Sequence, residues 1–106
     1  NVRFVFEDID YEPELLIWKK SDREKTVQNL AKLSQFLAKL NDWTKAGLEA
    51  SVGEWIKENG LGTGDVLWPM RVALSGQKNS PGPFEIAEVL EKEKTLERLA
   101  MAIEKL

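Results

Sequence analysis

Apolar and polar residues alternate along this chain with the period of an α-helix in several successive segments. The clearest segment follows Ser21 and Glu24, whose three-residue separation matches a capping box at a helix start. Apolar residues then recur every three or four positions, at Leu30, Leu33, Leu37 and Leu40. This spacing predicts a helix over residues 21–40.

A second, shorter helix is predicted between a polar turn and a glycine. Asn41 or Asp42 can cap its start, and Asn59-Gly60 marks its end, because glycine suits the left-handed residue that follows a helix. Its expected buried face consists of Leu48, Val52, Trp55 and Ile56.

The next apolar segment contains a proline, which limits where a helix can begin. Proline has no backbone N–H and fits best in the first turn, so Pro69 places the predicted start close to Leu67. Apolar residues at helical spacing continue to Ser75-Gly76, where we expect the helix to end.

Two more helices are predicted after a loop over residues 77–82. Pro83 suits the first helical position, and Phe84, Ala87 and Leu90 would share one face. A final helix would bury Leu96, Leu99, Ala100, Ile103 and Leu106.

These five helices, with no convincing strand, predict an all-α fold, a small helical bundle with short loops. Residues 1–20 form a lead-in segment that we expect to be irregular or briefly helical. Residues 21–106 form the expected helical subdomain.

Composition restricts the chemistry that this chain can perform. Its 106 residues, 42% of them hydrophobic, suffice for a single core. The absence of cysteine excludes disulfides, and the absence of histidine removes the commonest general acid–base group and zinc ligand. No Gly-rich phosphate loop is present either. We therefore expect a non-catalytic chain that itself binds no cofactor or metal.

The ends and the hydropathy of the chain give further expectations. No apolar run approaches the roughly 20 residues of a membrane span. The start of the chain also lacks the basic residues followed by an apolar run that characterise a secretion signal. We expect a soluble, cytoplasmic, monomeric chain. Because it begins with Asn1 rather than methionine, we interpret it as a fragment or processed product of a larger enzyme.

Charge is distributed unevenly around the formal net value of −3. Residues 1–14 are strongly acidic, whereas residues 15–41 carry six lysines and arginines against two acids. Residues 66–84 contain Arg71 and Lys78 and no acid. An anion could therefore approach one side of the domain, although a solvated helix face explains the lysines about as well.

Arg71 is the sharpest candidate for recognition, because it interrupts an otherwise apolar helix. Its planar guanidinium can pair bidentately with a base edge or a phosphate. The alternative is an outer-face arginine paired with an acid such as Glu85 or Glu88, and the residues alone favour this alternative.

A second candidate is the loop that precedes the fourth predicted helix, Ser80, Pro81, Gly82, Pro83 and Phe84. The prolines would hold its shape, Gly82 would let a flat base approach the backbone, and Phe84 would offer a ring for stacking. The alternative is an ordinary helix connector with Phe84 in the core, which the helical spacing of Phe84 favours.

Four tryptophans could be mistaken for a base-stacking set. Trp55 lies on an apolar helix face and is expected in the core, while Trp43 and Trp68 lie near helix starts, where partial exposure is normal. Trp18 adjoins Lys19 and Lys20 and could contact RNA, but we favour a structural role for it.

Three consecutive runs resemble the end of bacterial glutamyl-tRNA synthetases: GDVLWPMRVALSG (64–76), QKNSPGPFEIAEVL (77–90) and EKEKTLERLAMAIEKL (91–106). The run FEDIDYEPELLIWKK (6–20) is similar to the family segment that leads into the terminal bundle. The resemblance implies a C-terminal anticodon-binding domain. It also implies that Arg71, in Pro69-Met70-Arg71, is an anticodon contact and that residues 80–84 face the anticodon.

From the charge distribution we add candidate contacts to the RNA backbone, at Lys19, Lys20 and Lys78. The parent implied by the resemblance is a glutamate–tRNA ligase, which attaches glutamate to tRNA with ATP and magnesium. No signature of that chemistry lies in this fragment, so we expect the fragment to be inactive alone.

The rival hypothesis is a helical protein-interaction module whose proline-rich loop and tryptophans bind another polypeptide.

The chain departs from the family pattern at four positions. Met70 and Ser75 stand where leucine and threonine are more usual, and Pro83 replaces a commonly larger apolar residue. Glu91 stands where the family usually has a glycine at a helix end, so the junction before the last helix is expected to be longer or more continuous.

Overall fold

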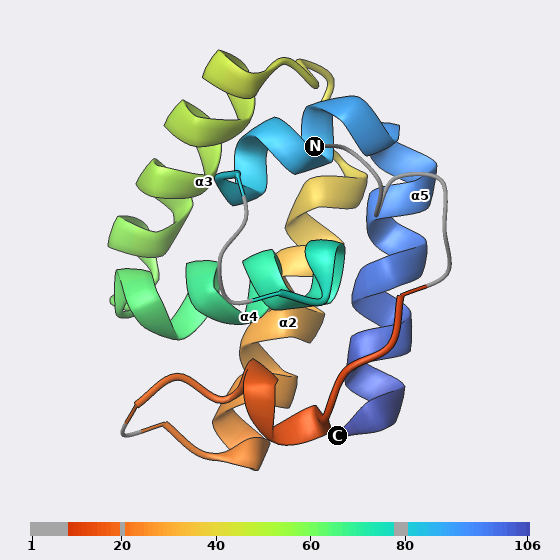
Figure 1. Ribbon diagram of the computed structural model, residues 1–106. Helices are drawn as coiled ribbons and strands as arrows, with labels where there is room; N and C mark the ends of the chain where they lie inside the picture. The colour runs from red at the N-terminus through yellow and green to blue at the C-terminus, as the bar shows by residue number, and fades with distance from the viewer. Residues whose placement is uncertain (1–8, 20, 78–80) are drawn as a thin grey trace.

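The computed structural model describes residues 9–19, 21–77 and 81–106, and these residues form an all-helical fold without a strand (Figure 1). The elements are a 3-10 helix η1 (Pro13–Leu16) and the α-helices α2 (Arg23–Ala38), α3 (Lys45–Glu58), α4 (Thr63–Ser75) and α5 (Pro83–Lys105). The predicted all-α class is confirmed. Four α-helices replace the five predicted, because the last two run together as α5.

The two first α-helices are capped by residues other than those predicted. Asp22, and not Ser21, is the N-cap of α2, and its Oδ1 accepts a hydrogen bond from the backbone N of Lys25 at 2.8 Å. Thr44 caps α3, where its hydroxyl oxygen accepts from the backbone N of Gly47 at 3.0 Å. Gly60 has a φ of 63°, which confirms the left-handed residue predicted after α3.

Helix α4 begins at Thr63, before the predicted start near Leu67, and carries Pro69 in its interior. A proline at this position leaves the carbonyl oxygen four residues earlier, on Asp65, without a helical N–H donor. The buried side chain of Asn29, on α2, donates its Nδ2 proton to that oxygen at 3.4 Å. A partner distant in sequence thus allows the helix to begin a full turn early.

Helix α5 bends at Glu91, whose φ of 69° and ψ of 170° are not helical. Figure 1 shows the two parts of α5 running in different directions. One turn before the bend, the carbonyl oxygen of Ala87 accepts hydrogen bonds from the indole Nε1 of Trp43 at 2.9 Å and from the hydroxyl of Thr95 at 3.4 Å. The expected junction before the last helix is therefore a kink inside one helix.

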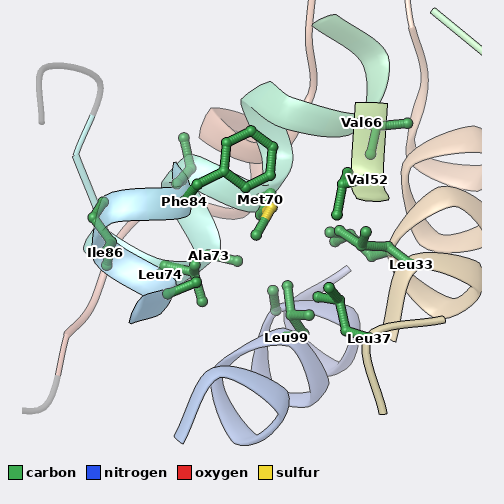
Figure 2. Close-up of a cluster of buried hydrophobic side chains, with 14 of the residues drawn as sticks. Leu33, Leu37, Val52, Val66, Met70, Ala73, Leu74, Phe84, Ile86 and Leu99 are labelled. Carbon is green, nitrogen blue, oxygen red and sulfur yellow. The ribbon is translucent and has the colours of Figure 1, made fainter. Parts of the chain in front are cut away.

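The core lies where α2, α4 and both parts of α5 meet, with α3 covering one side (Figures 1 and 2). Every α-helix contributes to it, and Leu16 of η1 is fully buried as well. Among the residues predicted as core, Ala100 is exposed, and Trp55 is only half-buried, with its ring stacked on Phe36 at a centroid distance of 5.4 Å.

The described part of the lead-in segment packs against the bundle. The Nζ of Lys105, at the end of α5, lies 2.7 Å from Oδ1 of Asp10, and Figure 1 shows this segment beside the C-terminus. A Cβ on Gly76 would lie 3.3 Å from the Cβ of Ile9, so the lead-in segment passes close to the end of α4.

Within the described ranges, no helix is both long and apolar enough to cross a membrane. The proposed boundary at residue 20 stays a prediction.

Candidate nucleic-acid interface

Arg71 lies on the partly exposed side of α4, while its neighbours Met70 and Val72 are buried. The ion pair that the sequence favoured is not formed. Glu85 pairs with the ammonium of Lys45 at 2.9 Å, and Glu88 accepts a hydrogen bond from the backbone N of Lys45 at 2.8 Å. No carboxylate of the described residues forms a salt bridge with Arg71, so its guanidinium is not neutralised by them.

The Arg71 side chain borders a shallow hollow of about 180 Å³, which we call the Arg71 hollow. Its lining comes from the turn after η1, from one face of α4 and from the start of α5, at Trp18, Gly64, Leu67, Trp68, Arg71 and Pro83. The structure therefore brings Arg71 together with the end of the predicted loop, at Pro83.

Two tryptophans form the wall of this hollow. The indole Nε1 of Trp68 donates to the carbonyl oxygen of Leu15 at 2.8 Å, which fixes its ring against η1. The rings of Trp18 and Trp68 are 5.1 Å apart between centroids and tilted by 40°. A Cβ on Gly64 would lie 2.3 Å from Nε1 of Trp18, so only glycine allows this indole to lie against α4.

The described part of the predicted loop consists of Pro81, Gly82, Pro83 and Phe84. Pro81 is exposed, Gly82 is the N-cap of α5, and Pro83 is the buried first residue of that helix, as predicted. Apart from its chain neighbours, no described atom lies within 4 Å of the position that a Cβ on Gly82 would occupy, so its backbone has open space beside it. Ser80, Lys20 and Lys78 lie outside the described residues.

Phe84 differs from the exposed Pro81 because its side chain lies in the core and the whole residue is only 9% exposed. Figure 2 shows it among the core side chains, near Met70. This burial matches the alternative of a core residue and leaves no open ring face for a stacked base. Phe84 instead anchors the start of α5, which carries Pro83 to the hollow.

A second, larger hollow of about 770 Å³ also includes the tryptophan pair in its lining and has a different charge. Among the described residues, its lining includes the carboxylates Asp10, Glu12 and Glu14 and one cation, Lys19. The exposed Lys19 places its Nζ 4.7 Å from the centroid of Trp18. Because acids outnumber bases here, the Arg71 hollow is the better site for an anionic strand. No cluster of side chains suited to a metal ion occurs among the described residues.

Comparison with known proteins places this arrangement in a family. The family described as "Anticodon binding domain" matches residues 1–103. The chain belongs to the anticodon-binding domain family. This match confirms the resemblance inferred from the sequence.

Curated relatives share the similarity along nearly the whole of this anticodon-binding domain. A glutamate–tRNA ligase of Clostridium tetani is 41% identical over 109 residues, covering 100% of this chain and 22% of the relative. One from Clostridium botulinum is 39% identical over 101 residues, covering 92% and 21%. The domain therefore spans about a fifth of the length of these relatives.

A solved structure agrees with the sequence relatives. The crystal structure of a glutamate tRNA ligase from Elizabethkingia meningosepticum, in complex with its amino acid, superposes with a TM-score of 0.78 at 27% identity. The superposition covers 96% of this anticodon-binding domain and 20% of that chain. The helical architecture is thus shared with an enzyme of that name.

Sequence reasoning missed most of the residues that surround Arg71. Gly64, Trp68 and Arg71 are spaced by four and three residues, which places them on one helix face. That signal was hidden because the predicted helix began near Leu67. Trp18 has no comparable signal, since its contact with α4 joins segments far apart in the chain.

Proposed function

We propose that this domain is the C-terminal part of a glutamate–tRNA ligase and that it contributes tRNA recognition at the anticodon loop. The family description and the names of the relatives support this function. The structural observation that supports it most directly is the meeting of Arg71 and Pro83 in one hollow, with no described carboxylate paired to the arginine.

Recognition would rest on geometry rather than on chemistry performed by the domain. The guanidinium presents several N–H donors in one plane, which suits the acceptor edge of an unpaired base or a phosphate. Bases in RNA loops are unstacked and are read by edge hydrogen bonds and stacking. Arg71 would therefore bond a base of the anticodon, and Pro81, Gly82 and Pro83 would shape the adjacent backbone; Ser80 belongs to the same proposal.

Lysines add attraction that does not depend on sequence. Lys19 is exposed, and Lys25, Lys32 and Lys39 are exposed along α2 and at its end. Such side chains attract the phosphate backbone over about a Debye length, roughly 8 Å at physiological salt. Lys20 and Lys78 are proposed to act in the same way.

The catalytic steps would take place elsewhere in the parent. There, glutamate would be joined to tRNA with ATP and magnesium, and we propose no site for either on this chain. Mixing the isolated domain with tRNA, glutamate, ATP and magnesium should yield no glutamyl-tRNA. Formation of that product would contradict the assignment of the domain as non-catalytic.

Salt dependence tests the proposal against the rival protein-interaction module. For a single-stranded partner, the logarithm of the binding constant falls with the logarithm of salt by about 0.7 per neutralised phosphate. We expect such a slope for an anticodon stem-loop, and none for a predominantly apolar protein contact. A stem-loop that does not bind at low salt, or binds independently of salt, would contradict the RNA-binding function.

A further inference from the structure

The Arg71 hollow has the size of a site for a single flat ring. Its volume of about 180 Å³ lies below the roughly 300 to 1,000 Å³ of typical small-molecule sites. Its described lining is mainly aromatic and apolar, and Arg71 is the one charged side chain among these residues. An unpaired base fits this combination, because its faces stack on aromatic rings while its edge accepts hydrogen bonds.

Trp18 is held at this hollow by contacts on several sides. Its ring touches that of Trp68, whose indole N–H is itself bonded to Leu15. The backbone beside it is fixed as well, because the N–H of Ser21 donates to the carbonyl oxygen of Trp18 at 2.7 Å. A preorganised aromatic ring loses little conformational entropy when a ligand binds.

The approach of a phosphate strand is also directed by charge. Among the described residues, no carboxylate lines the Arg71 hollow, whereas three carboxylates line the larger hollow that shares the tryptophan pair. An RNA strand would therefore meet Trp18 from the Arg71 side. Lys19, which follows Trp18 in the chain, lines the larger hollow, with its Nζ 4.7 Å from the centroid of Trp18.

We propose that Trp18 is the stacking wall for an unpaired RNA base whose edge is bonded by Arg71. This inference rests on the proposed function and deepens it, because it assigns a base contact to the lead-in segment. Sequence reasoning favoured a structural role for Trp18. Its place in the Arg71 hollow instead gives its ring a ligand-facing role.

Affinity for an anticodon stem-loop tests this role. Replacing Trp18 by leucine should weaken binding about 5- to 150-fold, the loss expected for one stacked base. The matched control is Trp55→Leu, which removes a half-buried tryptophan that stacks on Phe36 and lies outside the Arg71 hollow. The control should change affinity less than twofold. Gly64→Ala, which forces the Trp18 indole away from α4, should weaken binding in the same direction as Trp18→Leu.

Tryptophan fluorescence provides a second test of the stacking role of Trp18 if Trp18→Leu fails to fold. The chain has four tryptophans, and base stacking should quench the one that it covers. The comparison is made in a Trp68→Phe background, which removes the other tryptophan of the Arg71 hollow. In that background, Trp18→Phe retains an aromatic ring and should lose most of the RNA-dependent quenching, while Trp55→Phe should retain it. Quenching that persists in Trp18→Phe would overturn the inference.

The outcomes also separate this inference from the proposed function. If Arg71→Ala weakens binding but Trp18→Leu and Gly64→Ala do not, the stacking role is wrong and RNA recognition stands. If the stem-loop does not bind the native chain, both the inference and the proposed function fail. If Arg71→Ala and Trp18→Leu each bind it as tightly as the native chain does, the stacking inference and the role of Arg71 fail together.

Discussion

The side-chain amide of Asn29 donates a hydrogen bond to the backbone carbonyl oxygen of Asp65, the oxygen that Pro69 leaves without a helical donor. The bond joins α2 to the first turn of α4, the helix that carries Arg71. A buried carbonyl without a partner destabilises a fold by about 1 to 3 kcal/mol. This contact therefore supports the helix on which the proposed recognition depends.

Asn29→Ala should lower the free energy of unfolding by about 1 to 3 kcal/mol, because it removes that donor. The same substitution should be less costly in a Pro69→Ala background, where residue 69 regains an N–H for the Asp65 oxygen. Urea denaturation of the four proteins in this cycle measures the coupling. Equal losses in both backgrounds would show that Asn29 does not replace the missing helical bond.

Glu91→Gly should stabilise the domain by about 1 kcal/mol. The φ of 69° and ψ of 170° at Glu91 belong to a region that is essentially restricted to glycine, and other residues lose about 1 to 3 kcal/mol there. Part of this gain is cancelled by the larger chain entropy of glycine in the unfolded state. Thermal unfolding provides the measurement. Glu91→Ala is the control, and a similar gain in this variant would contradict the role of the backbone.

Phe84 should matter for stability and not for stacking. Phe84→Ala should cost about 3 to 5 kcal/mol, as expected for a buried aromatic ring. Phe84→Leu retains much of the apolar volume, so its stem-loop affinity should equal that of the native chain at a temperature where both are folded. A fall in the affinity of Phe84→Leu, with its helical content unchanged, would return Phe84 to the contact surface.

The domain should lose stability as pH rises above about 10, because burial raises the pKa of Tyr11 to about 12 from its ordinary value of 10.0. Between these values the unfolded chain gives up the phenolic proton and the folded chain retains it, so deprotonation favours unfolding. The contribution is complete below pH 10.0 and declines through this window.

Tyr11 is the only tyrosine, so tyrosinate absorbance reports its titration directly. The midpoint should be higher in buffer than in denaturant. Tyr11→Phe, the matched control, should lose less stability than the native chain over the same pH range. Identical midpoints in the two solvents would show that the lead-in segment does not bury this ring.

Periodicity was sufficient to predict the all-α class and the face of α2 that carries Leu30, Leu33 and Leu37. The glycines at positions 60 and 76 were sufficient to predict the ends of α3 and α4. These features depend on residues close in the chain. The start of α4 was predicted wrongly because the effect of Pro69 is offset by Asn29, some 40 positions away, and no local pattern contains that information.

In the candidate site, too, the features set by nearby residues were predicted and those set by distant residues were not. Arg71 and Pro83 were chosen from local sequence and resemblance, and the structure brings them to one hollow. Trp18 and Gly64 could not be paired from the sequence, because their contact requires the turn after η1 to lie against α4. The hydrogen bond from Trp43 to the carbonyl oxygen of Ala87, near the kink at Glu91, likewise joins residues far apart in the chain.

Titration of an anticodon stem-loop against the native chain and Arg71→Ala tests the central claim most directly. We predict that Arg71→Ala weakens binding about 5- to 150-fold, the loss of one bidentate base contact. Arg23→Ala is the matched control, because it removes an exposed arginine outside the Arg71 hollow and should lower affinity only slightly. Equal affinities of the native chain and Arg71→Ala would contradict the role of Arg71 in recognition.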